Sequence, residues 1–495
     1  MRPWIQLLIV LVFFFSAGSK ASAQFSDQRD PSQSSSVQID YGAEDTTFAQ
    51  KLWSTLQRPG LLHSMLLDHF MQMNETSIDS GKDSTVYELS TKGFKRRHRK
   101  HVFMVTELED PRQYSHLEPF SMIDFNRTDG FFLGLGSSSM FDFGPHDEFG
   151  VNAGGGYGFE NKRWQAFLGG EFRIPLAGRK EIQDTLFEHI FVVPPTLAIG
   201  AELHNVTSTD DAWRAHRMEN AAYAFFARED FRDYYKVAGY SGYIAFRPSR
   251  HGEIKVEWRS DNYESRPQDV FFGRWGGNKV LPPNPAVSEG RLNSVVLTFQ
   301  EETVRPHGSR SDNLFGDSVS FEQLKGESSI LQFELGHMPG VDYGFNRYLL
   351  DSRNFLPITS YLGFDSRLMF EATTGDLVVQ KAEFLGGPGS LPGLKNKSIA
   401  GNRLLLVNTE IRFNLAELSK VFGPDMQIVV NNDLGFVGLT QESSIVKGFE
   451  GLRFNSLVYN VGAAIGWTSG VQLGVSWRTD VQESPRVVFR LERPF

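Results

Sequence analysis

The chain has no cysteine among its 495 residues, which excludes disulfide bridges, thiolate metal sites and cysteine nucleophiles. It also lacks the apolar runs of roughly 20 residues that membrane helices need, because the longest run covers only residues 4–15. Lys and Arg number 50 against 59 Asp and Glu, and no broad basic domain stands out, so we expect no nucleic acid partner. The 40% of hydrophobic residues nevertheless predict ordered structure over most of the length.

Sequence motifs of common enzymes are absent as well. There is no G-x-S-x-G, H-E-x-x-H, phosphate-binding loop or zinc-ligand spacing. The 12 histidines are scattered, and isolated ones such as His146 and His337 are typical of polar loops. We therefore predict a protein that is not an enzyme and has no cofactor or metal. A hydrolase with catalytic groups at the rim of a barrel is the alternative, although no such constellation is present in the sequence.

The first 23 residues have the layout of an export signal. Arg2 supplies a basic start, residues 4–15 an apolar core, and residues 21–23 the small-x-small pattern that precedes cleavage. We predict cleavage between Ala23 and Gln24, which places the mature chain outside the cytoplasm. An uncleaved anchor helix is the alternative, but the apolar core is short for a membrane span.

Residues 24–119 are predicted to form a separate periplasmic segment. A polar leader, 26–36, precedes an ordered pattern of strand, helix, helix, strand and strand. This order is similar to that of a POTRA module, with an unrelated plug or docking segment as the alternative. A basic run, 95–101, falls between the last two predicted strands and indicates a solvated turn or a contact for phosphates or an acidic partner. The five predicted elements cover 36–41, 46–56, 61–73, 85–90 and 102–108.

From residue 120 onward, apolar and small or polar residues alternate in segments of about ten residues, which is the period of a β-strand. Such alternation fits a soluble sandwich or a membrane barrel. The export signal, the lack of cysteine and the aromatic residues near strand ends all favour the barrel. The chain also ends on an alternating strand with Phe489, Leu491 and a terminal Phe495, and this resembles the C-terminal signal for insertion of outer-membrane barrels.

The predicted fold class is therefore all-β, an antiparallel transmembrane barrel over residues 120–495 with a small N-terminal α/β segment. These 376 residues allow about 23 per strand for 16 strands, which suits spanning strands of roughly 9 to 11 residues better than 12 strands would. A connection at 304–328 is unusually long for a periplasmic turn in this scheme. Counting back from the C-terminus, the predicted strands lie near 485–495, 470–480, 454–467, 425–438 and 402–414.

The loop before the fifth of these strands carries the most specific motif. It runs from Glu383 to Leu394 and is followed by Gly401-Asn402-Arg403 and a strand through 408–413. This resembles the long sixth loop and twelfth strand of the bacterial surface antigen superfamily, which includes the BamA and TamA assembly factors and two-partner secretion transporters. The lead into the barrel at 124–134 is also similar, and implies a first strand beginning near Gly130. The motif residues are Gly386, Gly387, Leu391, Pro392, Gly393 and Leu394.

In that superfamily an Arg-Gly pair at the loop tip folds into the lumen, where the guanidinium contacts an acidic residue on the wall. Here Pro392 stands at the Arg position and Gly393 remains. Proline offers neither charge nor donor and instead favours a tight turn with the following glycine. On the next strand the alternation places Glu410 and Arg412 on the lumenal face, where they can pair with each other or across strands. An ordinary glycine-rich surface loop is the alternative interpretation.

The resemblance implies a bacterial outer-membrane protein whose N-terminal segment lies in the periplasm. It implies that the barrel assists insertion or translocation of other proteins, through a weak seam between the first and last strands and through the inward-folded loop. Its partners are then outer-membrane lipid, client outer-membrane or secreted proteins, and unknown periplasmic accessory proteins. The alternative is a passive channel or surface protein of the same fold, which the missing loop Arg favours.

Overall fold

The computed structural model describes residues within 123–491, and the predicted cleavage site at Ala23 and Gln24, the segment 24–119 and Phe495 lie outside the described residues. The chain divides into two units, 1–94 with 449–456 and 95–448 with 457–495. Of the first unit the structure describes only 449–456, which include a short 3₁₀ turn, η5 (Phe454–Ser456). Everything below concerns the second unit. The described ranges are 123–142, 148–176, 180–183, 189–192, 195–249, 251–270, 279–307, 323–339, 343–359, 361–415, 426–467, 471–481 and 483–491.

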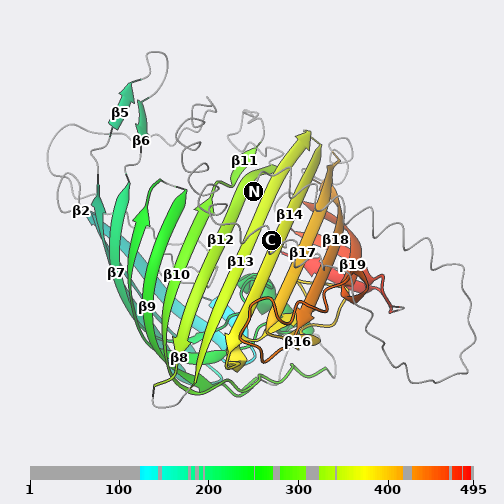
Figure 1. Cartoon of the computed structure of the whole chain (residues 1–495), viewed down its shortest axis with the longest axis horizontal. Helices are drawn as coiled ribbons and strands as arrows, with labels where there is room; N and C mark the ends of the chain where they lie inside the picture. The colour runs from blue at the N-terminus through cyan, green and yellow to red at the C-terminus, as the bar shows by residue number, and fades with distance from the viewer. Residues whose placement is uncertain are drawn as a thin grey trace, which may run out of the picture. The chain divides into compact units, whose positions relative to one another are not determined.

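One antiparallel sheet dominates the second unit (Figure 1). It contains 17 described strands. Because β10 and β11 (Arg305–His307) follow one another and both pair with β12, they occupy one position, and the sheet has 16 strand positions. Each strand pairs with the next along the chain, as in the predicted all-β architecture, which is confirmed. The other strands are β1 (Ile123–Asn126), β2 (Gly130–Asp142), β3 (Glu148–Gly158), β4 (Arg163–Pro175), β7 (Thr196–Ser208), β8 (Tyr235–Arg247), β9 (Gly252–Ser265), β10 (Gly290–Glu302), β12 (Gln323–His337), β13 (Gly344–Thr359), β14 (Leu362–Gly375), β17 (Arg403–Asn414), β18 (Met426–Gly438), β19 (Val458–Trp467), β20 (Gln472–Arg478) and β21 (Arg486–Arg490).

The connections carry smaller elements. A two-stranded hairpin, β5 (Lys180–Gln183) with β6 (His189–Val192), lies between β4 and β7. Between β7 and β8 are a short α-helix, α4 (Arg217–Ala222), and a π-helical turn, η3 (Tyr223–Ala227). The long loop before β17 holds the turn η4 (Val379–Lys381) and a second hairpin, β15 (Glu383–Leu385) with β16 (Ile399–Gly401). Among the described residues no helix has the length and apolarity to cross a membrane.

The five C-terminal strands match their predicted places within a few residues, because strict alternation marks them clearly. The start of the barrel was predicted wrongly. The strand beginning at Gly130 is the second, not the first, since β2 pairs with β3 on one side and with the short β1 on the other. Four residues carry too little alternation to be recognised as a strand. Gly130 itself has a φ of +68°, which lets the chain turn tightly between β1 and β2.

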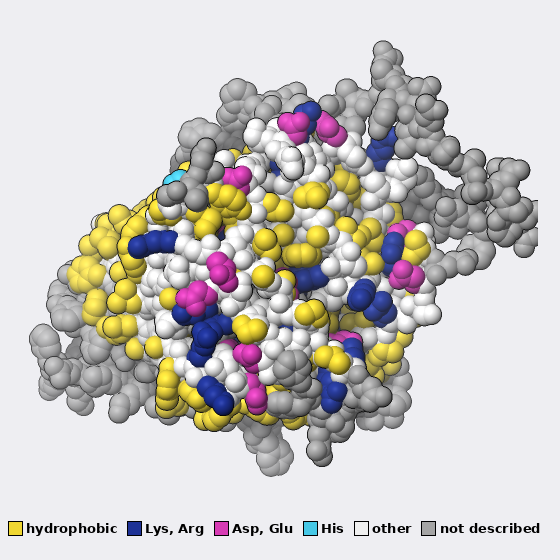
Figure 2. Space-filling model, turned by 90° about the horizontal axis from the view of Figure 1, so that it is seen from below, with side chains coloured by type: hydrophobic (Ala, Val, Ile, Leu, Met, Phe, Trp, Pro, Cys, Tyr) yellow, Lys and Arg dark blue, Asp and Glu magenta, His cyan; other side chains and the backbone are white. Residues whose placement is uncertain are grey.

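Apolar side chains cover the outside of the sheet and polar ones line the inside, the reverse of a soluble protein. On β9, for example, Val256 and Trp258 are exposed, whereas Lys255 and Glu257 between them are buried. The end-on view in Figure 2 shows charged groups gathered over the middle of this end and hydrophobic groups along one rim. Further exposed outward residues are Leu133, Trp164, Leu168, Ile199, Leu203, Ile244, Val295, Leu335, Leu473 and Val487, and further buried inward residues are Glu171, Glu334, Asp351, Arg367, Glu371, Asn408, Asp433, Asn460 and Ser476.

The two edge strands meet at one short segment. Phe125 of β1 packs on Phe225 of η3, with ring centroids 5.2 Å apart. On the opposite side, the Tyr223 hydroxyl bonds to the backbone of Phe489 in β21. Because both edges contact the same eleven residues of α4 and η3, the sheet curls round until its ends face each other. This is the barrel that the alternation predicted.

Candidate functional site: the loop network inside the barrel

The loop between β14 and β17 folds back on itself before it reaches the barrel wall. Its two arms pair as β15 and β16, and its tip is tied by hydrogen bonds from the amide of Gly387 to the carbonyls of Leu391 (3.2 Å) and Leu394 (3.1 Å). Gly386 and Gly387 take φ values of +106° and +89°, in the region that glycine alone occupies readily. The tip is therefore a compact, internally bonded unit rather than an open surface loop.

Three leucines fix this tip to the interior of the barrel. Leu385 and Leu391 are fully buried and Leu394 nearly so. They pack in one apolar cluster with Trp213 and with inward residues of four wall strands, β12, β13, β14 and β17. A side chain at Gly435 on β18 would collide with Leu385 and Leu391, so this glycine makes room for the loop. The wall residues of the cluster are Ile330, Leu349, Met369, Leu404 and Leu406.

Two arginines, Arg214 and Arg367, donate to backbone carbonyls of the tip. Arg214, in the connection between β7 and β8, donates to the carbonyls of Phe384 (2.7 Å) and Gly386 (3.4 Å), and pairs with Asp211 at 2.9 Å. Arg367 on β14 donates to both carboxylate oxygens of Asp351 at 2.8 Å and to the carbonyl of Gly389 at 3.4 Å. Both guanidinium groups also lie over Trp213, 4.3 and 4.9 Å from the ring centroid.

Amide side chains of the wall complete the hold on the tip. Asn408 on β17 donates to the carbonyl of Ser390 at 2.8 Å, and Asn460 on β19 accepts the amide of Gly393 at 2.7 Å. Both asparagines also donate to Asp433 on β18, at 2.9 and 2.8 Å. Gly393 lies so close to the wall that a Cβ there would fall 2.1 Å from the Asn460 side-chain oxygen. Asn408, Asn460 and Arg367 of the wall thus hold the tip together with Arg214 of the β7–β8 connection.

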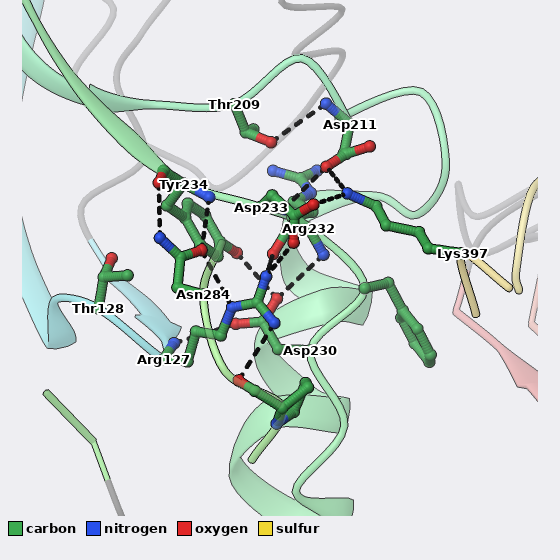
Figure 3. Close-up of polar contacts among 12 residues, drawn as sticks. Arg127, Thr128, Thr209, Asp211, Asp230, Arg232, Asp233, Tyr234, Asn284 and Lys397 are labelled. Atoms are coloured by element: carbon green, nitrogen blue, oxygen red, sulfur yellow. Dashed lines mark hydrogen bonds and ion pairs between the residues drawn. The ribbon is translucent and has the colours of Figure 1, made fainter. Parts of the chain in front are cut away.

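A second polar cluster joins four connections at this end of the barrel (Figure 3). Arg127, in the turn between β1 and β2, donates to the carbonyl of Arg232 at 2.6 Å and forms an ion pair with Asp233. Its side chain also bonds to Asn284, in the connection between β9 and β10, at 3.3 Å. Lys397 of the long loop forms ion pairs with both Asp233 and Asp211. The carboxylate of Asp233 therefore links the first turn of the barrel to the long loop.

The carboxyl groups of these connections have shifted pKa values. Burial alone would raise the pKa of Asp211, but the Lys397 and Arg214 cations outweigh it and hold that pKa below its usual range. For Asp230, burial dominates and raises the pKa, although Arg127 and Asn220 partly offset it. Burial and then the nearby Glu371 carboxylate raise the pKa of Glu383 well above its usual range. The neighbouring cations therefore lower the pKa of one buried acid of the network, Asp211, while burial raises the pKa of two others, Asp230 and Glu383.

The structure brings most of the sequence-selected residues to this site. Gly386, Gly387, Leu391, Gly393 and Leu394 are buried at the loop tip, and half-buried Pro392 lines a small cavity beside the wall. Glu410 and Arg412 face inward as an ion pair, and Arg412 also contacts Asp365 at 2.5 Å on the neighbouring strand. The selected residues of the last strand lie elsewhere, at the barrel edge: Phe489 and Leu491.

Sequence reasoning missed the residues that hold the loop: Trp213, Arg214 and Arg367. For Arg367 a signal existed, because Asp365, Arg367 and Glu371 share one face of an alternating strand. Trp213 and Arg214 lie in a connection without periodicity, so their inward position depends on the closed barrel. Within the described ranges, no group of three or more His, Asp or Glu is arranged to hold a metal ion.

Sixteen antiparallel strand positions with apolar residues outside, polar residues inside and adjoining edges define a membrane-spanning β-barrel. No protein-family profile and no curated protein matches the sequence. Solved structures similar in fold include BamA from Haemophilus ducreyi lacking POTRA domains 1–3, with 13% identity and a TM-score of 0.41. CdiB from Acinetobacter baumannii (10%, TM-score 0.33) and from Escherichia coli (14%, 0.37) are also similar. Each match covers 74% of this chain, and 67%, 57% and 61% of the respective structures, so the chain matches less than two thirds of either CdiB.

Proposed function

We propose that the protein is an outer-membrane barrel of the bacterial surface antigen type that assists the insertion or translocation of other proteins. The observation that carries the proposal is the long loop, which is held inside the lumen by Arg214, Arg367, Asn408 and Asn460. A loop that merely covers a surface needs no buried cations directed at its backbone. The sequence resemblance at 383–413 and the inside-out sheet support the same function.

The packing of the lumen favours this function over that of a wide pore. The cavity between the tip and β17–β20 holds about 40 Å³, and the one between Trp213 and Lys397 about 60 Å³. Spaces of this size take only a few water molecules each. A larger open space of about 640 Å³ lies between residues 394–399 of the loop and residues 478–486 beside the last strand. A client polypeptide is therefore better served at the seam of the barrel than through its middle. We further propose that the protein acts without catalysis or a cofactor.

Depletion of the protein in its own host tests this function. If it assists insertion, the amounts of other outer-membrane barrels fall while inner-membrane proteins keep their levels. A variant without residues 386–394 should fail to restore them, although it reaches the outer membrane. An unchanged outer-membrane proteome after depletion contradicts the proposal. The same experiment with residues 24–119 removed asks whether that segment, proposed to be periplasmic, docks clients or accessory proteins.

A passive channel is the second candidate, and the observation that favours it is Pro392 in place of the loop arginine. Planar-bilayer recordings distinguish the two. A channel gated by the loop shows conductance that rises when residues 386–394 are deleted. If neither the parent nor the deletion variant conducts, the channel function is excluded.

A further inference from the structure

The free edge of the last strand is held by side chains of a helix rather than by a strand. Tyr223, the first residue of η3, donates its hydroxyl proton to the carbonyl of Phe489 at 2.6 Å and accepts the Phe489 amide at 2.9 Å. One hydroxyl thus satisfies both backbone groups of a residue on β21. In a complete barrel those groups belong to the neighbouring strand.

Glu219 makes a similar contact two residues further along the strand, at Leu491. Its carboxylate accepts the amide of Leu491 at 3.2 Å and lies 2.7 Å from the guanidinium of Arg490. Glu219 is fully buried, and it stands four residues before Tyr223, so both side chains project from one side of the helical segment. Residues 489 and 491 are the alternate positions whose backbone groups point to the same edge of a strand. Two side chains one helical turn apart therefore replace a strand along this edge.

The other side of the segment packs on the start of the barrel. Phe225 contacts Phe125 and Phe131, with ring centroids 5.2 and 5.4 Å apart, and Arg217 pairs with Asp124 at 3.2 Å. Phe225 and Ala224 belong to an apolar cluster that includes Phe125. The segment, drawn as the short green helix in Figure 1, thus stands between the two edge strands, with hydrogen bonds toward β21 and an aromatic cluster and one ion pair toward β1. The described residues show no ladder joining β1 to β21.

We propose that α4–η3 is a removable cap on the barrel seam: Tyr223 and Glu219 occupy the edge of β21, and their withdrawal frees that edge to pair with an extended strand of another polypeptide. The identity of that strand as a client strand rests on the proposed function. The cap itself rests on the contacts above.

Two features suit the segment to leave, and a third suits β21 to accept a strand in its place. A side-chain cap supplies a few hydrogen bonds, whereas an added strand forms a ladder with every second residue of the edge. The π-helical turn of η3 is a rare form that occurs frequently at functional sites. The outward Val487 is 74% exposed and Phe489 38%, which gives an incoming strand an apolar face to continue.

Hydrogen exchange on the full chain in phospholipid nanodiscs tests the cap. The double variant Tyr223→Phe with Glu219→Met removes the hydroxyl and the carboxylate that accepts the Leu491 amide, and it keeps side-chain size and helix propensity. The amides of Phe489 and Leu491 should exchange on the order of 100-fold faster, as expected from the loss of three hydrogen bonds, while β12 and β13 keep their protection. Tyr157→Phe on β3 is the matched control and should leave all of these amides unchanged. Unchanged exchange at Phe489 and Leu491 in a folded double variant overturns the cap.

A labelled peptide with the sequence of residues 471–481 probes the freed edge, because this strand already pairs with the opposite edge of β21. The double variant should bind it at least ten times more tightly than the parent. The chain has no cysteine, so Phe125→Cys with Phe225→Cys can be joined by a short bis-maleimide, which should abolish peptide binding. Equal binding in all three forms overturns strand pairing at this edge. If exchange and binding respond as expected but depletion leaves other barrels unaffected, the cap stands and the proposed function fails.

Discussion

Replacing Arg214 by methionine should release the long loop from the lumen. Methionine keeps the unbranched shape that packs beside Trp213, but it loses every donor of the guanidinium. The carbonyls of Phe384 and Gly386 then lose a charged donor, while Asp211 keeps its ion pair with Lys397. The change thus removes the hold on one side of the loop and leaves no isolated buried carboxylate behind.

The expected cost follows from three contacts. A hydrogen bond from a charged donor contributes about 1.5 to 3 kcal/mol, and the 3.4 Å bond to Gly386 less than the 2.7 Å bond to Phe384. The contact over the Trp213 ring adds about 0.5 to 2 kcal/mol. Since methionine packing returns part of this, we expect a net loss of about 3 kcal/mol, or roughly a 100-fold change in the opening equilibrium of the loop.

Hydrogen exchange of the Gly387 and Leu394 amides, both bonded within the tip, measures that equilibrium. Their exchange should accelerate roughly 100-fold in Arg214→Met, with the strands of the wall unaffected. Arg173→Met is the matched control. It also removes an arginine that pairs with a carboxylate, and that carboxylate, Glu171, keeps its second partner, Arg247. If loop exchange is the same in parent and Arg214→Met, the guanidinium does not hold the loop and the reasoning is refuted.

The remaining predictions concern the same loop. Gly389→Ala should destabilise the loop by about 1 to 3 kcal/mol, because the φ of Gly389 is +72° and the new Cβ would lie 2.2 Å from the Arg214 carbonyl oxygen. The temperature at which half of the barrel runs as unfolded protein on a gel measures this loss. The pKa of Glu383 is raised in the folded protein, so its contribution to stability is fully present below the pKa of the unfolded chain and is lost as the pH rises through the folded pKa. In a denaturant titration, Glu383→Gln should therefore unfold at a higher denaturant concentration than the parent at pH 8 and at the same concentration at pH 4. Pro392→Arg should speed exchange at Leu394, not slow it, because Asp433 already accepts three amides from Asn408, Asn431 and Asn460, and a new guanidinium must displace one of them to reach it.

Much of the barrel could be predicted from its sequence because each strand carries its own signal. Alternation identified the last five strands and placed Glu410 and Arg412 on the inner face, where the structure also has them. The short β1 was missed because four residues have no measurable period. The two helical turns between β7 and β8 were also missed, since their stability comes from contacts with both barrel edges rather than from local propensity.

The site could be predicted only in part. Glycine and leucine spacing indicated the inward loop, but one of its main supports, Arg214, lies 170 positions away in sequence from Phe384, whose carbonyl it holds. Nothing local in the sequence relates these two positions. Pro392 indicated a departure from the loop motif that the sequence resembles, but not what holds the tip instead, because the asparagines on β17 and β19 come together only when their strands are paired across β18.

Liposomes that contain the purified full chain test the central claim most directly, that a barrel with an inward-held loop assists other polypeptides. The measurement is the rate at which an added unfolded eight-stranded outer-membrane barrel becomes protected from protease. We predict that the rate with full-chain liposomes is clearly higher than with empty liposomes. With liposomes that contain Arg214→Met, the rate should lie close to that of empty liposomes. Equal rates in full-chain and empty liposomes would contradict the account.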